Sequence, residues 1–111
     1  MTEKVWGTTE CLYYSPVVEV HRITVKPGGY CSVHRHHKLN QFQVVSGELK
    51  VLLFEPEYHI FLGPGDRFTV PTMRWHQFQA TGPVEAMEVY VPAALSPEDI
   101  ERRSEGGLVK L

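Results

Sequence analysis

The sequence predicts an all-β barrel or two-sheet sandwich followed by a short C-terminal helix. Nine glycines and eight prolines are spread along the 111 residues, and these residue types mark turns and strand ends. The runs between them are about five to nine residues long, and apolar side chains recur in them at every second position. Roughly eight or nine short strands at such even spacing are typical of a sandwich or a closed barrel.

Two of these runs show the alternation most clearly. In 48–54, one set of alternate side chains is wholly apolar and is expected to face the interior: Leu49, Val51 and Leu53. In 87–91, the set placed inside in the same way consists of Met87, Val89 and Val91. Glu88 and Tyr90 are therefore expected to face outward.

The predicted helix lies near the C-terminus. Ser96 is a suitable N-cap, Pro97 suits the first helical position, and the pair Gly106-Gly107 would end the segment. Residues 1–111 are expected to form a single domain, because two domains of half this length would each have a marginal core.

Composition excludes several classes of function. The formal net charge of −2 gives no basic excess for nucleic acid or an anionic membrane. The longest apolar runs, 11–14 and 51–54, are far too short to span a bilayer. The first ten residues lack the apolar stretch of a secretory signal, and two cysteines are too few for a disulfide scaffold. We therefore expect a reduced, cytoplasmic protein without nucleic-acid or membrane partners.

Histidines are the most informative residues, because six occur in so short a chain. His34 and His36 are two positions apart, so on a strand both imidazoles share one face. In 75–79, alternation places His76 on the same face as Phe78, with the neighbouring glutamines outside. Three converging imidazoles form a common metal site. The sequence thus predicts a divalent metal, Zn, Fe, Mn or Ni, bound by these three histidines.

A fourth ligand is expected from the run 40–47. If Asn40 faces inward, Phe42 and Val44 do so too; if Gln41 faces inward, Phe42 is exposed. Burial of apolar area favours the first register. Asn40 is therefore the predicted fourth ligand, with Gln41 as the alternative.

The remaining histidines and the second cysteine are assigned other roles. His37 is expected to face outward by alternation, and His21 and His59 are expected to be surface or hydrogen-bonded residues. Cys31 is out of phase with the metal histidines and is expected to be a small packing residue.

The spacing of these residues resembles the two motifs of the cupin superfamily, whose members are double-sheet jelly rolls. The first motif has glycine, HxH, glutamate and glycine, and here the corresponding residues are Gly28, His34-Arg35-His36, Asn40 and Gly47. The second has glycine, PxG, histidine and asparagine, and the corresponding residues are Gly65, Pro71-Thr72-Met73, His76 and Ala80. The resemblance implies a cupin jelly-roll β-barrel.

A narrower resemblance extends over nearly the whole chain. The opening 4–7, the segment 22–29, the turn 62–66 and the stretch 96–102 are similar to type II phosphomannose isomerases. That resemblance implies a metal-dependent protein of the sugar-phosphate isomerase or epimerase type, such as one that interconverts mannose 6-phosphate and fructose 6-phosphate. It also implies a homodimer, for which the apolar residues near the N-terminus could supply an interface or, in a monomer, a lid: Val5, Trp6, Leu12 and Tyr13.

Three departures from the family pattern bear on the activity. Asn40 stands in place of the glutamate ligand, Met73 in place of the motif glycine, and Ala80 in place of the asparagine. An aldose–ketose isomerase needs a base, and no catalytic base is assigned, because Glu48, Glu85 and Glu88 are all expected to face outward.

Two alternatives follow from the missing acid. Three imidazoles and an amide leave a divalent ion with its full charge, which resembles the three-histidine iron site of cupin dioxygenases. A non-catalytic module that binds a metal or a sugar is the other alternative.

Recognition of a phosphorylated sugar would need cations and a stacking surface. The available cations are Arg22, Lys26, Arg67 and Arg74, although each also suits an ordinary surface position. Trp75 and Tyr30 could stack on a sugar ring, but core packing is the favoured role for both.

Overall fold

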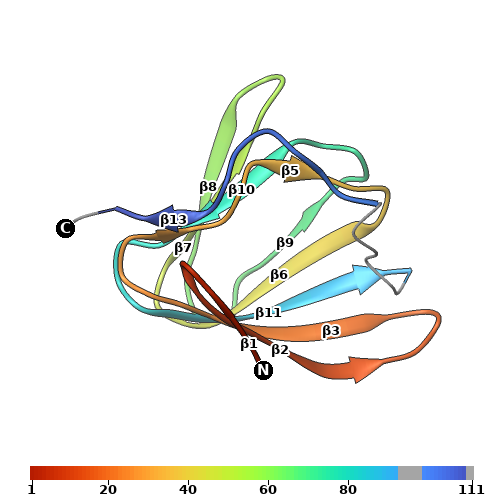
Figure 1. Ribbon diagram of the computed structural model, residues 1–111, viewed down its shortest axis with the longest axis horizontal. Coiled ribbons are helices and arrows are strands. Elements are labelled where there is room, and N and C mark those ends of the chain that lie inside the picture. The colour runs from red at the N-terminus through yellow and green to blue at the C-terminus, as the bar shows by residue number, and fades with distance from the viewer. Residues whose placement is uncertain (93–98, 110–111) are drawn as a thin grey trace.

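The computed structural model describes residues 1–92 and 99–109, whose strands form two sheets that face each other (Figure 1). The first sheet has six strands in the order β1 (Thr2–Lys4), β2 (Gly7–Tyr14), β3 (Glu19–Val25), β11 (Val84–Val91), β6 (Leu39–Ser46) and β9 (Arg67–Val70). The second sheet runs β12 (Glu101–Arg102), β5 (His34–Arg35), β10 (His76–Gln79), β4 (Gly29–Tyr30) and β13 (Gly107–Leu108). It is extended by β7 (Leu49–Leu53), which pairs with β10, and by β8 (Tyr58–Leu62), which pairs with β7.

The predicted all-β architecture is confirmed, with more strands than the pattern indicated. The additional strands, β4, β5, β12 and β13, have two residues each, which is too short for a recognisable alternation. The pairings in both sheets are antiparallel, and β11 at the centre of the first sheet pairs with both β3 and β6.

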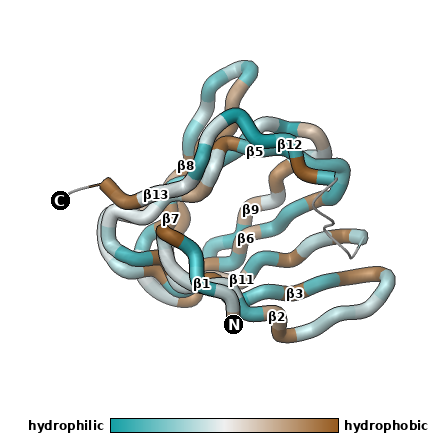
Figure 2. The backbone as a smooth tube through the Cα atoms, viewed as in Figure 1, coloured by the Kyte–Doolittle hydropathy of each residue, from teal (hydrophilic) through white to brown (hydrophobic). Residues whose placement is uncertain are grey.

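The core lies between the two sheets. Its fully buried side chains include Ile23, Val25, Leu49, Val51, Val70 and Ala86. Trp6 closes one part of it, with its ring edge-on to Phe78 at a centroid distance of 4.9 Å. Figure 2 shows hydrophobic and hydrophilic residues interleaved along the strands. The predicted inward faces of 48–54 and 40–44 are both correct, since Leu53, Phe42 and Val44 are also buried.

The prediction of which alternate side chains of β11 face the interior is wrong. Val84, Ala86 and Glu88 are buried, whereas Val91 is exposed and Met87 is only partly buried. The first half of the strand decides the phase, because Val84 and Ala86 pack in the core. A shift of one residue turns the other set of side chains inward, and this carries Glu88 and Tyr90 into the interior.

The predicted C-terminal helix is also corrected. Its expected cap and first residue lie in 93–98, outside the described residues, and the chain beyond them forms strands. β12 pairs with β5, and β13 pairs with β4. The tertiary pairing overrides the local helix signals, because β12 and β13 pair at the two ends of the strand order β12-β5-β10-β4-β13 of the second sheet. Within the described residues there is no α-helix, and hence none long and apolar enough to cross a membrane.

Candidate metal centre

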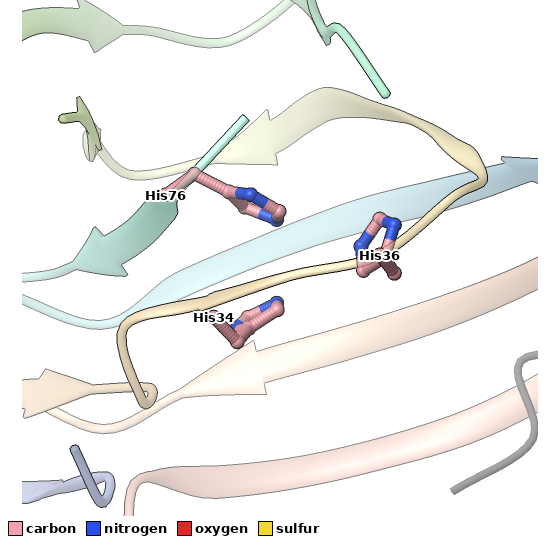
Figure 3. A group of neighbouring side chains, drawn as sticks. All are labelled: His34, His36 and His76. Atoms are coloured by element: carbon pink, nitrogen blue, oxygen red, sulfur yellow. The ribbon is translucent and has the colours of Figure 1, made fainter. Parts of the chain in front are cut away.

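The three predicted metal histidines come together on the second sheet (Figure 3). His34 of β5 and His76 of β10 are direct partners in an antiparallel pair, and His36 follows two residues after His34. The ring centroids of His34 and His76 lie 4.4 Å apart, and those of His36 and His76 lie 5.1 Å apart. One nitrogen from each ring lies within 4.8 Å of the others. The two-residue spacing and the β5–β10 pairing together produce this cluster.

Backbone hydrogen bonds orient each imidazole. In all three residues, Nδ1 lies 2.8–2.9 Å from a carbonyl oxygen two positions away along the chain, namely that of Ser32, Lys38 or Arg74. Nδ1 therefore carries the proton and donates it, which leaves the lone pair on Nε2. The Nε2 atoms of His36 and His76 are buried and have no hydrogen-bond partner among the described residues. This is the arrangement of a metal-ligating histidine.

Burial keeps the three imidazoles neutral. Desolvation lowers the pKa of His34 to about 4, against an opposing hydrogen bond to Ser32. Desolvation and the neighbouring His34 lower the pKa of His76 to about 3. The pKa of His36 is lowered as well, again chiefly by burial. At neutral pH all three rings can therefore donate a lone pair without first losing a proton.

Asn40 faces the interior and is fully buried. Its Nδ2 donates a hydrogen bond to Oε2 of Glu88 at 3.1 Å. An ionised carboxylate can only accept, so this contact fixes which end of the amide points to Glu88. The opposite end, Oδ1, is buried without a hydrogen-bond partner in the described structure. Gln41, the alternative ligand, is partly exposed and bonds to Thr69 instead.

Glu88 is a buried residue of this region that the sequence reasoning placed on the outside. Its Oε2 also accepts a hydrogen bond of 2.6 Å from the hydroxyl of Tyr90. Burial raises the pKa of Glu88, while the hydrogen bonds from Tyr90 and Asn40 lower it. The interior thus contains a carboxylate after all, supplied by β11 rather than by the motif position on β6. The buried Val84 and Ala86 were the signal that could have revealed it.

A cavity of about 500 Å³ opens beside these residues. His34 and His36 line it from the second sheet, and Glu88 and Tyr90 line it from the first. Its cationic lining residues are Lys4 and Arg102. Its size falls within the range of small-molecule sites.

The four cations considered as phosphate partners lie elsewhere, since none of them is among the described residues that line this cavity. Arg22 pairs with Glu10 and Glu85 at 3.4 and 3.5 Å. Arg74 donates to the carbonyl oxygens of Phe54 and Pro56. These contacts leave both arginines as structural residues.

Trp75 and Tyr30, for which stacking on a sugar was the less favoured role, are not among the described residues that line this cavity. The buried ring of Trp75 is covered by the guanidinium groups of Arg35 and Arg103, at 4.5 and 3.9 Å from its centroid. Tyr30 lines a different cavity. The favoured packing role of Trp75 is therefore confirmed.

The other histidines and Cys31 agree with their assigned roles. His37 is exposed and bonds to Asp99 at 2.7 Å, and His59 is exposed. His21 is partly buried and bonds to Glu19 at 2.8 Å. Cys31 is buried, and burial raises the pKa of its thiol.

Comparison with known proteins identifies the family. The profile of the cupin domain matches residues 21–91 of this chain. The chain belongs to the cupin family. This match includes all three clustered histidines, Asn40 and Glu88. It agrees with the two-sheet architecture.

Several relatives contain a similar segment. The alginate biosynthesis protein AlgA of Pseudomonas syringae is 33% identical over 101 residues, which cover 87% of this cupin and 20% of that protein. A mannose-1-phosphate guanylyltransferase of Klebsiella pneumoniae is 28% identical over 100 residues, covering 87% and 21%. This chain therefore spans about a fifth of the length of these curated relatives.

Solved structures support the fold. A variant of oxalate decarboxylase from Bacillus subtilis superposes with a TM-score of 0.82 at 17% sequence identity, covering 91% of this chain and 29% of that one. At this level of identity the likeness shows a shared cupin architecture.

Proposed function

We propose that His34, His36 and His76 bind one divalent metal ion, with Oδ1 of Asn40 as the fourth protein ligand. Three of the four buried side-chain polar atoms that lack a hydrogen-bond partner in the described structure belong to this set: Nε2 of His36, Nε2 of His76 and Oδ1 of Asn40. Leaving such an atom unpaired costs about 1–3 kcal/mol. A bound cation would satisfy all three at once, and this observation carries the proposal.

The donor set suits the chemistry of such an ion. Neutral imidazoles are good ligands for Zn, Fe, Ni and, less selectively, Mn. When bound, the metal would act as a Lewis acid toward a substrate oxygen. Metal content measured on protein purified without chelators tests the proposal. H34Q/H36Q/H76Q should contain about one equivalent less metal than the native protein; equal metal content of the two proteins would refute the assignment.

The further proposal is that the cavity converts a sugar phosphate, as an isomerase or epimerase does. Such a reaction moves a proton between neighbouring carbons and needs a positioned base. Glu88 is the candidate base, because its carboxylate lines the cavity and is held by Tyr90 and Asn40. Lys4 and Arg102 are the candidate partners for the phosphate. The names of the relatives, which refer to mannose 1-phosphate and alginate, support this substrate class.

Proton exchange tests this activity directly. Metal-loaded protein is incubated in D₂O with mannose 6-phosphate, whose C2 proton is followed by NMR, or with fructose 6-phosphate, whose C1 protons are followed. We expect exchange in the native protein and a loss of at least about a hundredfold in E88Q. No exchange with any hexose phosphate would leave metal binding intact and remove the isomerase assignment.

The neutral donor set supports one alternative reaction. An iron-dependent dioxygenase would use the three histidines and Asn40 without requiring a protein base. Ferrous protein prepared without oxygen would then consume oxygen when given a thiol, a diketone or a catechol. Oxygen uptake together with absent proton exchange would favour this alternative, and absence of both reactions would favour a binding module.

A homodimer remains part of the proposal. Leu12 and Tyr13 of β2 and the preceding Val5 are 43%, 56% and 63% exposed. Trp6, in contrast, is buried in the core and is withdrawn as an interface residue. The tip of the β2–β3 hairpin adds a further hydrophobic stretch (Figure 2). Leu12 and Tyr13 belong to the first sheet, whereas Val5 also lines the cavity that contains His34 and His36.

A further inference from the structure

A second group of metal-ligating side chains lies on the first sheet. Cys11 belongs to β2, and Glu19 and His21 belong to β3. One donor atom from each lies within 4.8 Å of the others. Cys11 and His21 are direct partners in the β2–β3 ladder, and Glu19 lies two positions before His21. All three side chains therefore project from the same face.

We propose that Cys11, Glu19 and His21 form a second divalent-metal site, separate from the three-histidine cluster. The ions that fit it are of borderline softness, such as Zn²⁺ or Co²⁺, because the site combines a thiolate, an imidazole and a carboxylate. None of its ligands is a residue of the proposed first site.

The spacing of the donors fits a tetrahedral ion. At usual Zn–S, Zn–N and Zn–O bond lengths, neighbouring donors lie about 3.3–3.6 Å apart. Nε2 of His21 and Oε1 of Glu19 are joined by a hydrogen bond of 2.8 Å, so metal binding requires these two atoms to separate slightly. The thiol of Cys11, which contacts the carbonyl oxygen of Tyr13 at 3.7 Å, must turn toward them.

Thr9 supports the metal-bound form of His21. Its Oγ1 lies 3.4 Å from Nδ1 of His21. When Nε2 binds an ion, the remaining ring proton must reside on Nδ1, where the Thr9 hydroxyl can accept it. A second hydrogen bond of this kind orients many metal-ligating histidines.

Charge distinguishes the two sites. A thiolate and a carboxylate together neutralise a divalent ion, whereas three imidazoles and an amide leave its charge in full. A thiol must lose its proton to bind a metal ion, so the affinity of a site with a thiolate ligand rises with pH. Cys11 is exposed, which gives an ion access. Glu19 and His21 line the cavity that also contains His34 and His36.

Cobalt titration tests the second site by a signal that the first cannot produce. Reduced protein is titrated with CoCl₂ under anaerobic conditions, and the near-ultraviolet charge-transfer absorption of a thiolate bound to Co²⁺ is recorded. We expect one equivalent to produce this band in the native protein and in H76Q, which weakens the first site. C11S should abolish the band, H21Q should weaken Co²⁺ affinity at least about tenfold, and C31S is the matched control that retains it.

Three results would overturn the proposal. They are the absence of a thiolate band in the native protein, its persistence in C11S, and its disappearance in H76Q. The last would place the thiolate at the first site. Thermal melting of each variant verifies that it is folded, and exposed Cys11 makes C11S a mild substitution. If H76Q no longer binds an ion at the three-histidine site but keeps the thiolate band, the second site is supported whether or not the proposed function holds.

Discussion

Replacement of Asn40 by aspartate separates its two roles, as a hydrogen-bond donor to Glu88 and as a metal ligand. The side chain keeps its shape, and one oxygen can still occupy the position of the buried Oδ1. The other now faces the Glu88 carboxylate across the 3.1 Å that the native amide bridges. We therefore predict opposite effects of N40D on the metal-free and the metal-bound protein.

The loss of stability in metal-free N40D follows from the hydrogen bond that is lost and the charge repulsion that replaces it. A buried hydrogen bond to a charged group contributes about 1.5–3 kcal/mol, and two carboxylates at this separation repel by up to about 5 kcal/mol at an effective dielectric constant of 20. Proton uptake by the pair relieves part of this repulsion. The metal-free variant should lose about 2–5 kcal/mol of unfolding free energy, and its melting temperature should fall by about 10 °C or more. The added negative charge should raise metal affinity at least about tenfold.

Differential scanning calorimetry without metal and isothermal titration with metal measure the two effects. Q41E is the matched control, because it adds the same charge at the neighbouring position on the other face of β6 and should change neither quantity appreciably. If N40D melts like the native protein and binds metal no more tightly, Asn40 has neither role. If Q41E instead tightens binding, the alternative ligand is the correct one.

Three further predictions concern the buried ionisable groups and the surface of β2. In the folded protein the pKa is about 4 for His34 and about 3 for His76. Both values lie below the unfolded value of about 6.5. Only the unfolded chain therefore takes up these protons as the pH falls from about 6.5 to 4, and metal-free protein should lose stability over that window. The melting temperature should depend less on pH over this range in H34Q/H76Q than in the native protein. An equally steep pH dependence in the variant would contradict the role of these two histidines. E88Q should keep the fold and E88L should destabilise it by about 2–4 kcal/mol, because leucine leaves Asn40 and Tyr90 unpaired; equal stability of the two variants in urea would argue against the network. L12E/Y13E should convert a dimer to a monomer in sedimentation, and an unchanged mass would exclude β2 as the interface.

The part of the site that depends on local spacing could be predicted from the sequence. His34 and His36 share a face because they are two residues apart, and Asn40 turns inward because Phe42 must be buried. His76 joins them because β10 pairs with β5. Strand periodicity was enough to identify these residues, and the two-motif spacing added their common position in the fold.

The remaining features depend on tertiary placement. Glu88 was assigned outward because the apolar Met87 and Val89 looked like an inner face, whereas the packing of Val84 and Ala86 decides the phase. Lys4, near the N-terminus, lines the cavity because of how the chain folds. Strand periodicity contains no information about which distant residues line a cavity. β12 formed where capping residues indicated a helix, since a sheet edge offered pairing that local propensity cannot detect.

The central claim is that one ion is bound by the three imidazoles. Crystals of the protein grown with Co²⁺ or Zn²⁺ and measured on both sides of the metal absorption edge test it most directly. We predict an anomalous peak within bonding distance of Nε2 of His34, His36 and His76, about 2.0–2.1 Å from each nitrogen. Metal-saturated crystals with no peak among these three rings would contradict it.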